Sequence, residues 1–336
     1  MTPRSFRVQR TTRASRLGLG GAALALVGLI TLPLWGDPAG MRRLVELITL
    51  LVLAQMWNLL AGYAGLLSIG QQAYVGLGGY ALIVLADDLG LDPFLSVPLA
   101  GLIAAALALP TAALVFRFQG GYFAVGTWAV AEVFRLLVAN TGALGRGTGR
   151  TLKAVFPLAR ETREMVTYFL ALALGVAALV GIYAFLRARF GLGLMAVRDS
   201  EGASETLGVD VFRTKLAVYL LAAFGTGATG AVIYLNLLRI SPDAAFSINW
   251  TAATIFIVVI GGIGTLEGPL IGALVFFVLR ELLADFGAWY MILLGSLAVS
   301  VMLVYPQGLW GLIAKRWDVH FFPVQRRLEI DEPPRP

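Results

Sequence analysis

The chain has 336 residues, of which 58% are hydrophobic and only 14% are charged, and its formal net charge is +6. Because soluble domains carry about 25% charged residues, this composition is typical of a helical membrane protein, and we attribute the positive charge to topology and lipid-surface contact rather than to nucleic-acid binding. The sequence has no cysteine and a single histidine, His320 near the C-terminus, which excludes disulfides, thiolate chemistry and imidazole chemistry within the membrane.

Five arginines precede the first apolar run, and no acidic residue occurs before Asp37; the arginines are Arg4, Arg7, Arg10, Arg13 and Arg16. A secretory signal peptide can begin in this way, but the apolar run 17–35 is longer than a typical signal core and lacks a convincing cleavage site. We therefore predict a basic cytoplasmic tail over residues 1–16, followed by a first transmembrane helix.

Apolar runs of about twenty residues predict an all-α fold, a polytopic membrane protein with about 8–10 transmembrane helices. The predicted segments are 17–35, 43–61, 66–86, 93–116, 121–140, 166–187, 216–238, 248–262, 268–285 and 287–311. The eighth and ninth are short and are joined by a glycine-rich stretch, so half-helices or a re-entrant pair are alternatives there. The transmembrane domain then covers residues 17–313, and residues 314–336 form a second cytoplasmic tail.

The charges between the segments give a predicted orientation. With the N-terminus inside, six crossings place residues 187–215 inside, and four more place the tail with Lys315 and Arg316 inside, as the positive-inside rule requires. Two features disagree, because Arg42 and Arg43 and the basic loop 141–165 would lie outside. The alternative is that one segment before residue 140 does not cross.

Two segments carry polar residues at membrane depth. The stretch 62–80 contains six glycines in 19 residues, with small residues spaced four apart for close helix packing, together with Ser68, Gln71 and Gln72. Since unpaired amides are unfavourable in hydrocarbon, these side chains should face other helices or a water-filled pathway. Their role is then either hydrogen bonding between helices or lining the path of a polar solute. Glu132 and Arg135 are three residues apart on the fifth segment and can pair, either in the path or as a snorkelling pair near a helix end.

No residue pattern predicts an enzyme. The sequence lacks the G-x-x-x-x-G-K-[ST] phosphate loop, and no nucleophile–base set, carboxylate pair or metal cluster stands out. We therefore expect no catalytic residue, no bound cofactor and no metal in this chain. The small number of acidic residues deep in the segments also argues against a proton-relay transporter.

The stretch 195–216 is polar and charged, unlike the apolar segments on either side. Asp199 or Ser200 can cap a short helix over residues 201–207, and Gly208 can end it in the left-handed conformation. Ala203 and Leu207 form a small apolar stripe on this helix. A helix this short is unstable alone in water, so we predict that it docks on a soluble motor protein. The alternative is a solvated loop lying on lipid headgroups.

The chain resembles the LivM family of permease subunits in bacterial ABC importers for branched-chain amino acids. The resemblance extends over about residues 44–312 and rests on five stretches in order, which are 58–80, 118–137, 189–216, 261–274 and 305–309. Many relatives have histidine where this chain has Gln71, so no titratable group is expected there. Closely similar permeases import urea or short amides, and an ion-coupled carrier and a structural scaffold are further alternatives.

The resemblance implies a bacterial inner-membrane complex with four kinds of partner. These are a second, LivH-like permease subunit, two cytoplasmic ABC ATPase subunits that hydrolyse the ATP, a periplasmic solute-binding protein and the lipid bilayer. It makes residues 188–215 the coupling loop, for which we expect ATPase contacts from Arg198, Asp199, Glu201, Ala203, Glu205 and Gly208. For the translocation path we expect Ser68, Gln71, Gln72 and Glu132.

Overall fold

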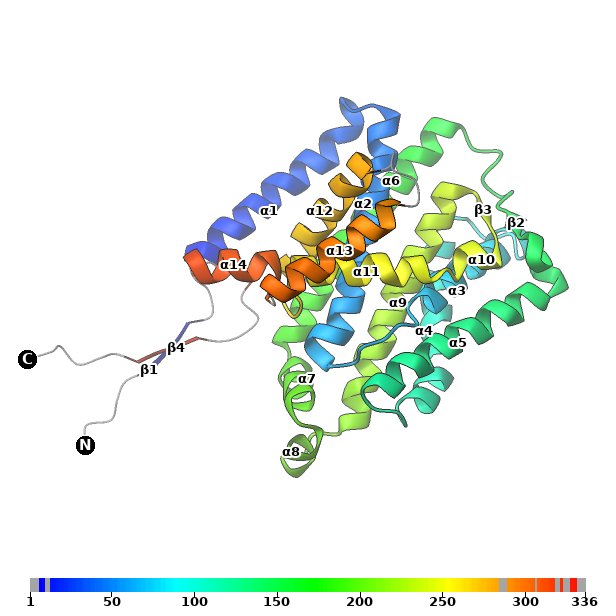
Figure 1. The fold of residues 1–336 in the computed structure, drawn as a ribbon. Coiled ribbons are helices and arrows are strands. Elements are labelled where there is room, and N and C mark those ends of the chain that lie inside the picture. Colours follow the sequence, from blue (N-terminus) through cyan, green and yellow to red (C-terminus); the bar gives the residue numbers. More distant parts are fainter. Residues whose placement is uncertain are drawn as a thin grey trace, which may run out of the picture.

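The computed structural model describes residues 6–9, 13–283, 289–305, 307–317, 321–322 and 327–330. Figure 1 shows a bundle of long helices from which two short helices project at one end. Seven helical stretches in the described part of the chain are long and apolar enough to cross a membrane. The predicted all-α, multi-pass membrane fold is therefore confirmed.

The helices follow the ten predicted segments closely. The first half of the chain contains α1 (Arg13–Thr31), α2 (Pro38–Asn58), α3 (Gln72–Ile83), α4 (Ser96–Val115), α5 (Gly121–Asn140) and α6 (Arg160–Arg187). The second half contains α7 (Arg189–Asp199), α8 (Glu201–Thr206), α9 (Val211–Leu237), α10 (Pro242–Ala245), α11 (Ile248–Gly261), α12 (Glu267–Leu283), α13 (Trp289–Val304) and α14 (Gly308–Trp317). Short π-helical turns over Leu59–Tyr63 and Val84–Asp88 extend α2 and α3.

Contacts between loops define two ends of the bundle. We call the end with α7 and α8 the α8 end, and the end with α10 and residues 141–159 the α10 end. At the α10 end, Arg150 pairs with Asp88 at 2.6 Å, and its hydrogen bonds hold the pKa of this carboxyl below its usual value. At the α8 end, Phe116 after α4 contacts Phe212 at the start of α9. Helices α3 and α4 thus run in opposite directions between the two ends, whereas neither α1 nor α3 is among the seven candidate spans, so a crossing by every segment before residue 140 stays a prediction.

Helices α11 and α12 run the length of the bundle. Near the start of α11, the Trp250 indole donates to the carbonyl of Ala244 in α10, whereas the N–H of Gly264, just after α11, donates to Asn58 at the far end of α2. Arg280 near the end of α12 pairs with Glu46 near the start of α2 at 2.6 Å. Helix α12 therefore runs back along α2 toward the α10 end; α11 has 14 residues and α12 has 17, and α12 is not among the seven candidate spans, so the half-helix alternative remains beside two full crossings.

Helix α9 forms the centre of the bundle and packs against α2, α3, α4 and α6. Its residues 225–231 are small or hydroxylated and all buried. A Cβ added to Gly78 of α3 would lie 1.9 Å from the carbonyl oxygen of Gly227, so the two helix backbones touch directly. Small residues thus allow α3 to lie closer to α9 than larger side chains would permit.

Two short strand pairs were not predicted from the sequence. Strand β1 (Phe6–Gln9) pairs antiparallel with β4 (Arg327–Ile330), which brings the two tails together beyond α1 and α14 (Figure 1). At the α10 end, β2 (Arg150–Thr151) pairs with β3 (Arg239–Ile240).

Candidate functional site

The predicted helix over residues 66–86 is wrong in its first part, because the chain between α2 and α3 is not helical. Gly65 adopts a positive φ of 70°, and the N–H of Leu66 donates back to the carbonyl of Leu60 at 2.9 Å. A residue with positive φ commonly ends a helix, and glycine is the usual residue at such a position. Ala61 and Gly65, like Ala64 and Ser68, therefore do not form the packing face of a single helix, and that prediction is also wrong.

Side chains from three helices satisfy backbone groups of this interruption, residues 65–71, and of Gln72, the first residue of α3. The indole of Trp57 in α2 donates to the carbonyl of Ser68 at 2.8 Å, and Oγ1 of Thr127 in α5 accepts from the N–H of Ile69 at 3.1 Å. Oγ1 of Thr251 in α11 accepts from the N–H of Gln72 at 3.2 Å. Non-helical backbone at membrane depth is tolerated only when protein supplies such partners.

The three polar side chains predicted for the path are buried here and lie within five residues of one another. Oε1 of Gln71 accepts from Thr226 of α9 at 3.0 Å, and Oε1 of Gln72 accepts from Thr251. Ser68 Oγ accepts from the N–H of Gly70 at 3.2 Å. Nε2 of Gln71, a residue only 4% exposed, has no hydrogen-bond partner among the described residues. The interruption therefore holds one unsatisfied amide donor inside the bundle.

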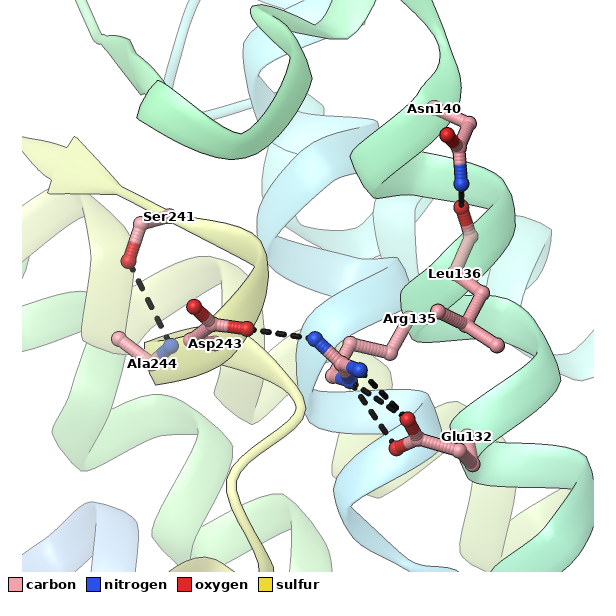
Figure 2. A network of polar contacts seen from close by, with 7 residues as sticks. All are labelled: Glu132, Arg135, Leu136, Asn140, Ser241, Asp243 and Ala244. Atoms are coloured by element: carbon pink, nitrogen blue, oxygen red, sulfur yellow. Dashed lines mark hydrogen bonds and ion pairs between the residues drawn. The ribbon is translucent and has the colours of Figure 1, made fainter.

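Glu132 is not joined to these three residues. Figure 2 shows Arg135 lying between Glu132 and Asp243 of α10. Its Nη2 is 2.5 Å from a Glu132 carboxylate oxygen, and its Nη1 is 2.6 Å from Oδ1 of Asp243. The predicted Glu132–Arg135 pair is thus present, and it connects α5 to α10 near the α10 end. This geometry favours an ion pair near a helix end over a role of Glu132 in lining the translocation path beside Gln71.

The short helix predicted around residue 203 is present as α8, and both of its ends are as expected. Ser200 has an extended backbone, and its Oγ accepts from the N–H of Ala203 at 3.3 Å, so Ser200 rather than Asp199 is the cap. Gly208 follows with a φ of 80°, and its N–H donates to the carbonyl of Glu205 at 2.9 Å. Asp210 then caps α9 by accepting from the N–H of Arg213.

Two of the predicted coupling residues face the bundle. Arg198 donates to the carbonyl of Gly62, close to the interruption, at 3.0 Å and also pairs with Asp199. Glu201 accepts from Lys215 of α9 at 2.5 Å. In contrast, Ala203, Glu205 and Gly208 are exposed. Leu207 is 79% exposed, so α8 presents its apolar stripe outward.

Sequence reasoning missed the partners that hold these elements in place. Thr127, Thr226 and Thr251 are hydroxylated residues in apolar helices, and Lys215 is 8% exposed. A threonine on the buried side of an apolar segment was the available signal, since its hydroxyl has to find a partner there. No pattern in the sequence predicted that Lys215 pairs with Glu201, because this contact depends on the conformation of the turn between α8 and α9.

Comparison with known proteins identifies relatives of the chain. The high-affinity branched-chain amino acid transport system permease protein LivM of Salmonella typhimurium is 30% identical over 278 residues, which cover 75% of this chain and 65% of the relative. LivM of Escherichia coli K12 is 30% identical over 316 residues, covering 85% of this chain and 74% of the relative. A probable LivH permease protein of Methanocaldococcus jannaschii is 23% identical over 270 residues, which cover 74% of this chain and 84% of the relative. No solved structure matches the chain.

A family model covers most of the chain. The model is described as the permease component of branched-chain amino acid transport systems, and it matches residues 41–305. This match includes α2 to α13, and therefore both the interruption before α3 and the short helix α8. The chain belongs to the family of permease components of branched-chain amino acid transport systems.

Proposed function

We propose that this chain forms half of the translocation pathway of an ATP-driven importer for branched-chain or other hydrophobic amino acids in the bacterial inner membrane. Its partners are a second, LivH-like permease subunit, two cytoplasmic ABC ATPase subunits and a periplasmic solute-binding protein. The names of the relatives support the solute class and the permease pair. The ATPase subunits hydrolyse ATP, and this chain contributes neither a nucleotide site nor a cofactor.

The observation that carries the coupling role is the exposed, capped helix α8. In this proposal residues 188–215 are the coupling loop, and the tails 1–16 and 314–336 share the cytoplasmic side with it. Ala203, Glu205 and Leu207 provide a small outward surface with one charge and an apolar stripe. Such a surface fits a groove on a soluble protein, because a helix of six residues is not stable alone in water.

Polar contacts connect α8 to the interruption before α3. Glu201 holds Lys215 at the start of α9, and Thr226, eleven residues further along α9, holds Gln71. Arg198 contacts the carbonyl of Gly62 directly. A displacement of α8 by the ATPase subunits would reach the interruption by both routes. In this proposal, Ser68, Gln71 and Gln72 change partners as the pathway opens, and Gln71 Nε2 then meets the solute or water.

Glu132 takes a different part in this proposal from the one expected from the sequence. Its contacts with Arg135 and, through that residue, with Asp243 fix α5 at the α10 end, which is the periplasmic end here. The solute would pass Glu132 at the entrance to the pathway, on the side of the solute-binding protein.

The coupling role is tested with Ala203→Arg in the reconstituted complex, with Ala203→Ser as the matched control. Ala203 is exposed, so arginine is accommodated in the isolated chain but blocks a groove fitted to a small side chain. We expect Ala203→Arg to lose co-purification of the ATPase subunits or stimulation of ATP hydrolysis by the loaded binding protein, and Ala203→Ser to retain both. Wild-type assembly and stimulation in Ala203→Arg would refute the coupling role.

A further inference from the structure

A cavity of about 370 Å³ lies at the α8 end of the bundle. It is bounded by the interruption after α2, by the connection between α4 and α5, and by the Glu201–Lys215 pair. Its lining includes Leu66, Leu67, Phe118, Phe123, Glu201 and Lys215. The volume is within the range of small-molecule sites, about 300–1,000 Å³.

The charged wall of this cavity has unused hydrogen-bonding capacity. The Lys215 ammonium has three protons, and among the described residues it donates only to Oε1 of Glu201, at 2.5 Å. No described residue donates to Oε2 of Glu201. Lys215 is almost fully buried, and buried charged groups normally find additional partners. The Lys215 ammonium and the Glu201 carboxylate therefore lie side by side at the cavity, and each can make further hydrogen bonds.

The remaining walls are apolar side chains together with Gln119 and two glycines. Leu66 and Phe123 are buried, whereas Leu67 and Phe118 are about half exposed and border the opening. This combination complements a small zwitterion with an apolar side chain. Its carboxylate would accept from the Lys215 ammonium, its ammonium would donate to Oε2 of Glu201, and its side chain would lie against Leu66 and Phe123.

We infer that this cavity is a second, low-affinity site for the transported amino acid on the α8 side of the membrane; it shares Gly65, Leu66 and Leu67 with the interruption but is separate from Ser68, Gln71 and Gln72. The inference rests on the proposed function for the identity of the solute. The site includes Glu201 of α8 and Lys215 of α9, so its occupancy is linked to the position of α8. An imported amino acid would pause there before it leaves, and a high concentration in the cytosol would refill it.

The test is equilibrium binding of L-leucine to the complete permease–ATPase complex in nanodiscs, without binding protein or ATP, by saturation-transfer NMR titration. Two further probes each lack one charge: L-leucinamide has no carboxylate, and 4-methylpentanoate has no ammonium group. Lys215→Met removes the cationic partner. Arg213→Gln removes a charge two residues away on the same helix, from an exposed pair with Asp210 outside the cavity, and is the matched control. Leu67→Trp fills the opening and leaves both charged groups in place.

We expect saturable leucine binding whose Kd rises at least about tenfold in Lys215→Met, which loses a charged hydrogen bond, and in Leu67→Trp, whose indole fills the opening, and stays within about twofold in Arg213→Gln. Both single-charge probes should bind at least about tenfold more weakly than leucine. The inference is overturned if wild type shows no saturable binding, or if leucine binds Leu67→Trp as well as wild type. Leucine uptake by the wild-type complex with its binding protein is measured separately, so failure of this site and failure of the proposed transport function give different results.

Discussion

The interruption before α3 and the short helix α8 are both irregular features, but they are held in different ways. Leu66, Ser68, Gly70 and Gln71 of the interruption are buried, side chains of α2 and α5 satisfy backbone groups within it, and a side chain of α11 holds the N–H of Gln72 that follows it. Helix α8 lies outside the bundle; it follows α7, whose Arg198 contacts Gly62, and it is attached by the Glu201–Lys215 pair and through the buried Ser204. The first feature is embedded in packed protein, and the second is attached by a few polar contacts.

This difference indicates which part moves. Exposed ion pairs contribute about 0–1 kcal/mol each, whereas leaving a buried donor without a partner costs about 1–3 kcal/mol. Since Lys215 is buried, α8 shifts at small cost only when the start of α9 moves with it, while the interruption rearranges only if its hydrogen-bond partners are exchanged. A partner that pushes on α8 would thus act on the weakly held part, and α9 would transmit the displacement to the strongly held part.

The largest effect on stability is expected for Gly78→Ala, which tests how tightly the region around α3 is packed. The new Cβ would lie 1.9 Å from the Gly227 carbonyl oxygen, so the two backbones must separate. We expect a loss of about 3 kcal/mol, read as a lower midpoint of thermal unfolding in detergent. Gly181→Ala on α6 is the control, because a Cβ there meets nothing within 4 Å. Equal stability of the two variants would contradict the close packing of α3 on α9.

A smaller effect is expected for Thr127→Val, which removes one hydrogen bond from the interruption. The partly buried N–H of Ile69 then loses its protein acceptor, so we expect a loss of about 1 kcal/mol. Thr206→Val in the exposed helix α8 is the control and should change stability by less than about 0.5 kcal/mol. Similar losses in both variants, measured by thermal unfolding, would remove the contrast between the two regions.

The smallest effect on stability is expected for Gln71→Leu. The substitution removes the unpaired Nε2 donor, which favours the variant, but it also removes the acceptor of the buried Thr226 hydroxyl, so the opposing effects should leave a change of less than about 1 kcal/mol in the free energy of unfolding. Amino acid uptake by the assembled complex should nevertheless fall about tenfold, which corresponds to about 1.4 kcal/mol of lost transition-state stabilisation. Unchanged uptake would reduce Gln71 to a packing residue.

The sequence predicted the helical segments well because their apolar runs are long, and it predicted α8 because Ser200 and Gly208 are local capping signals. It did not predict the interruption before α3. Gly65 was interpreted as a residue that lets helices pack, whereas its positive φ ends α2. Glycine serves both purposes, and only the tertiary partners distinguish them.

The site was predicted less completely than the fold, for the same reason. The polar residues Ser68, Gln71 and Gln72 were visible as exceptions in an apolar segment, but their partners Thr226 and Thr251 are more than 150 residues away along the chain. The apolar stripe of Ala203 and Leu207 is a local pattern, and it predicted which side of α8 is exposed. Its attachment through Lys215 depends on how α8 and α9 turn, which no local pattern specifies.

The central claim is that α8 faces the cytosol, where ATPase subunits can reach it, and single-cysteine labelling tests it most directly. The chain has no cysteine, so Thr206→Cys in α8 and Thr148→Cys at the α10 end each provide a unique thiol. Right-side-out and inside-out membrane vesicles are treated with a membrane-impermeant maleimide. We predict labelling of Thr148→Cys only in right-side-out vesicles and of Thr206→Cys only in inside-out vesicles. Labelling of Thr206→Cys in right-side-out vesicles would contradict the account.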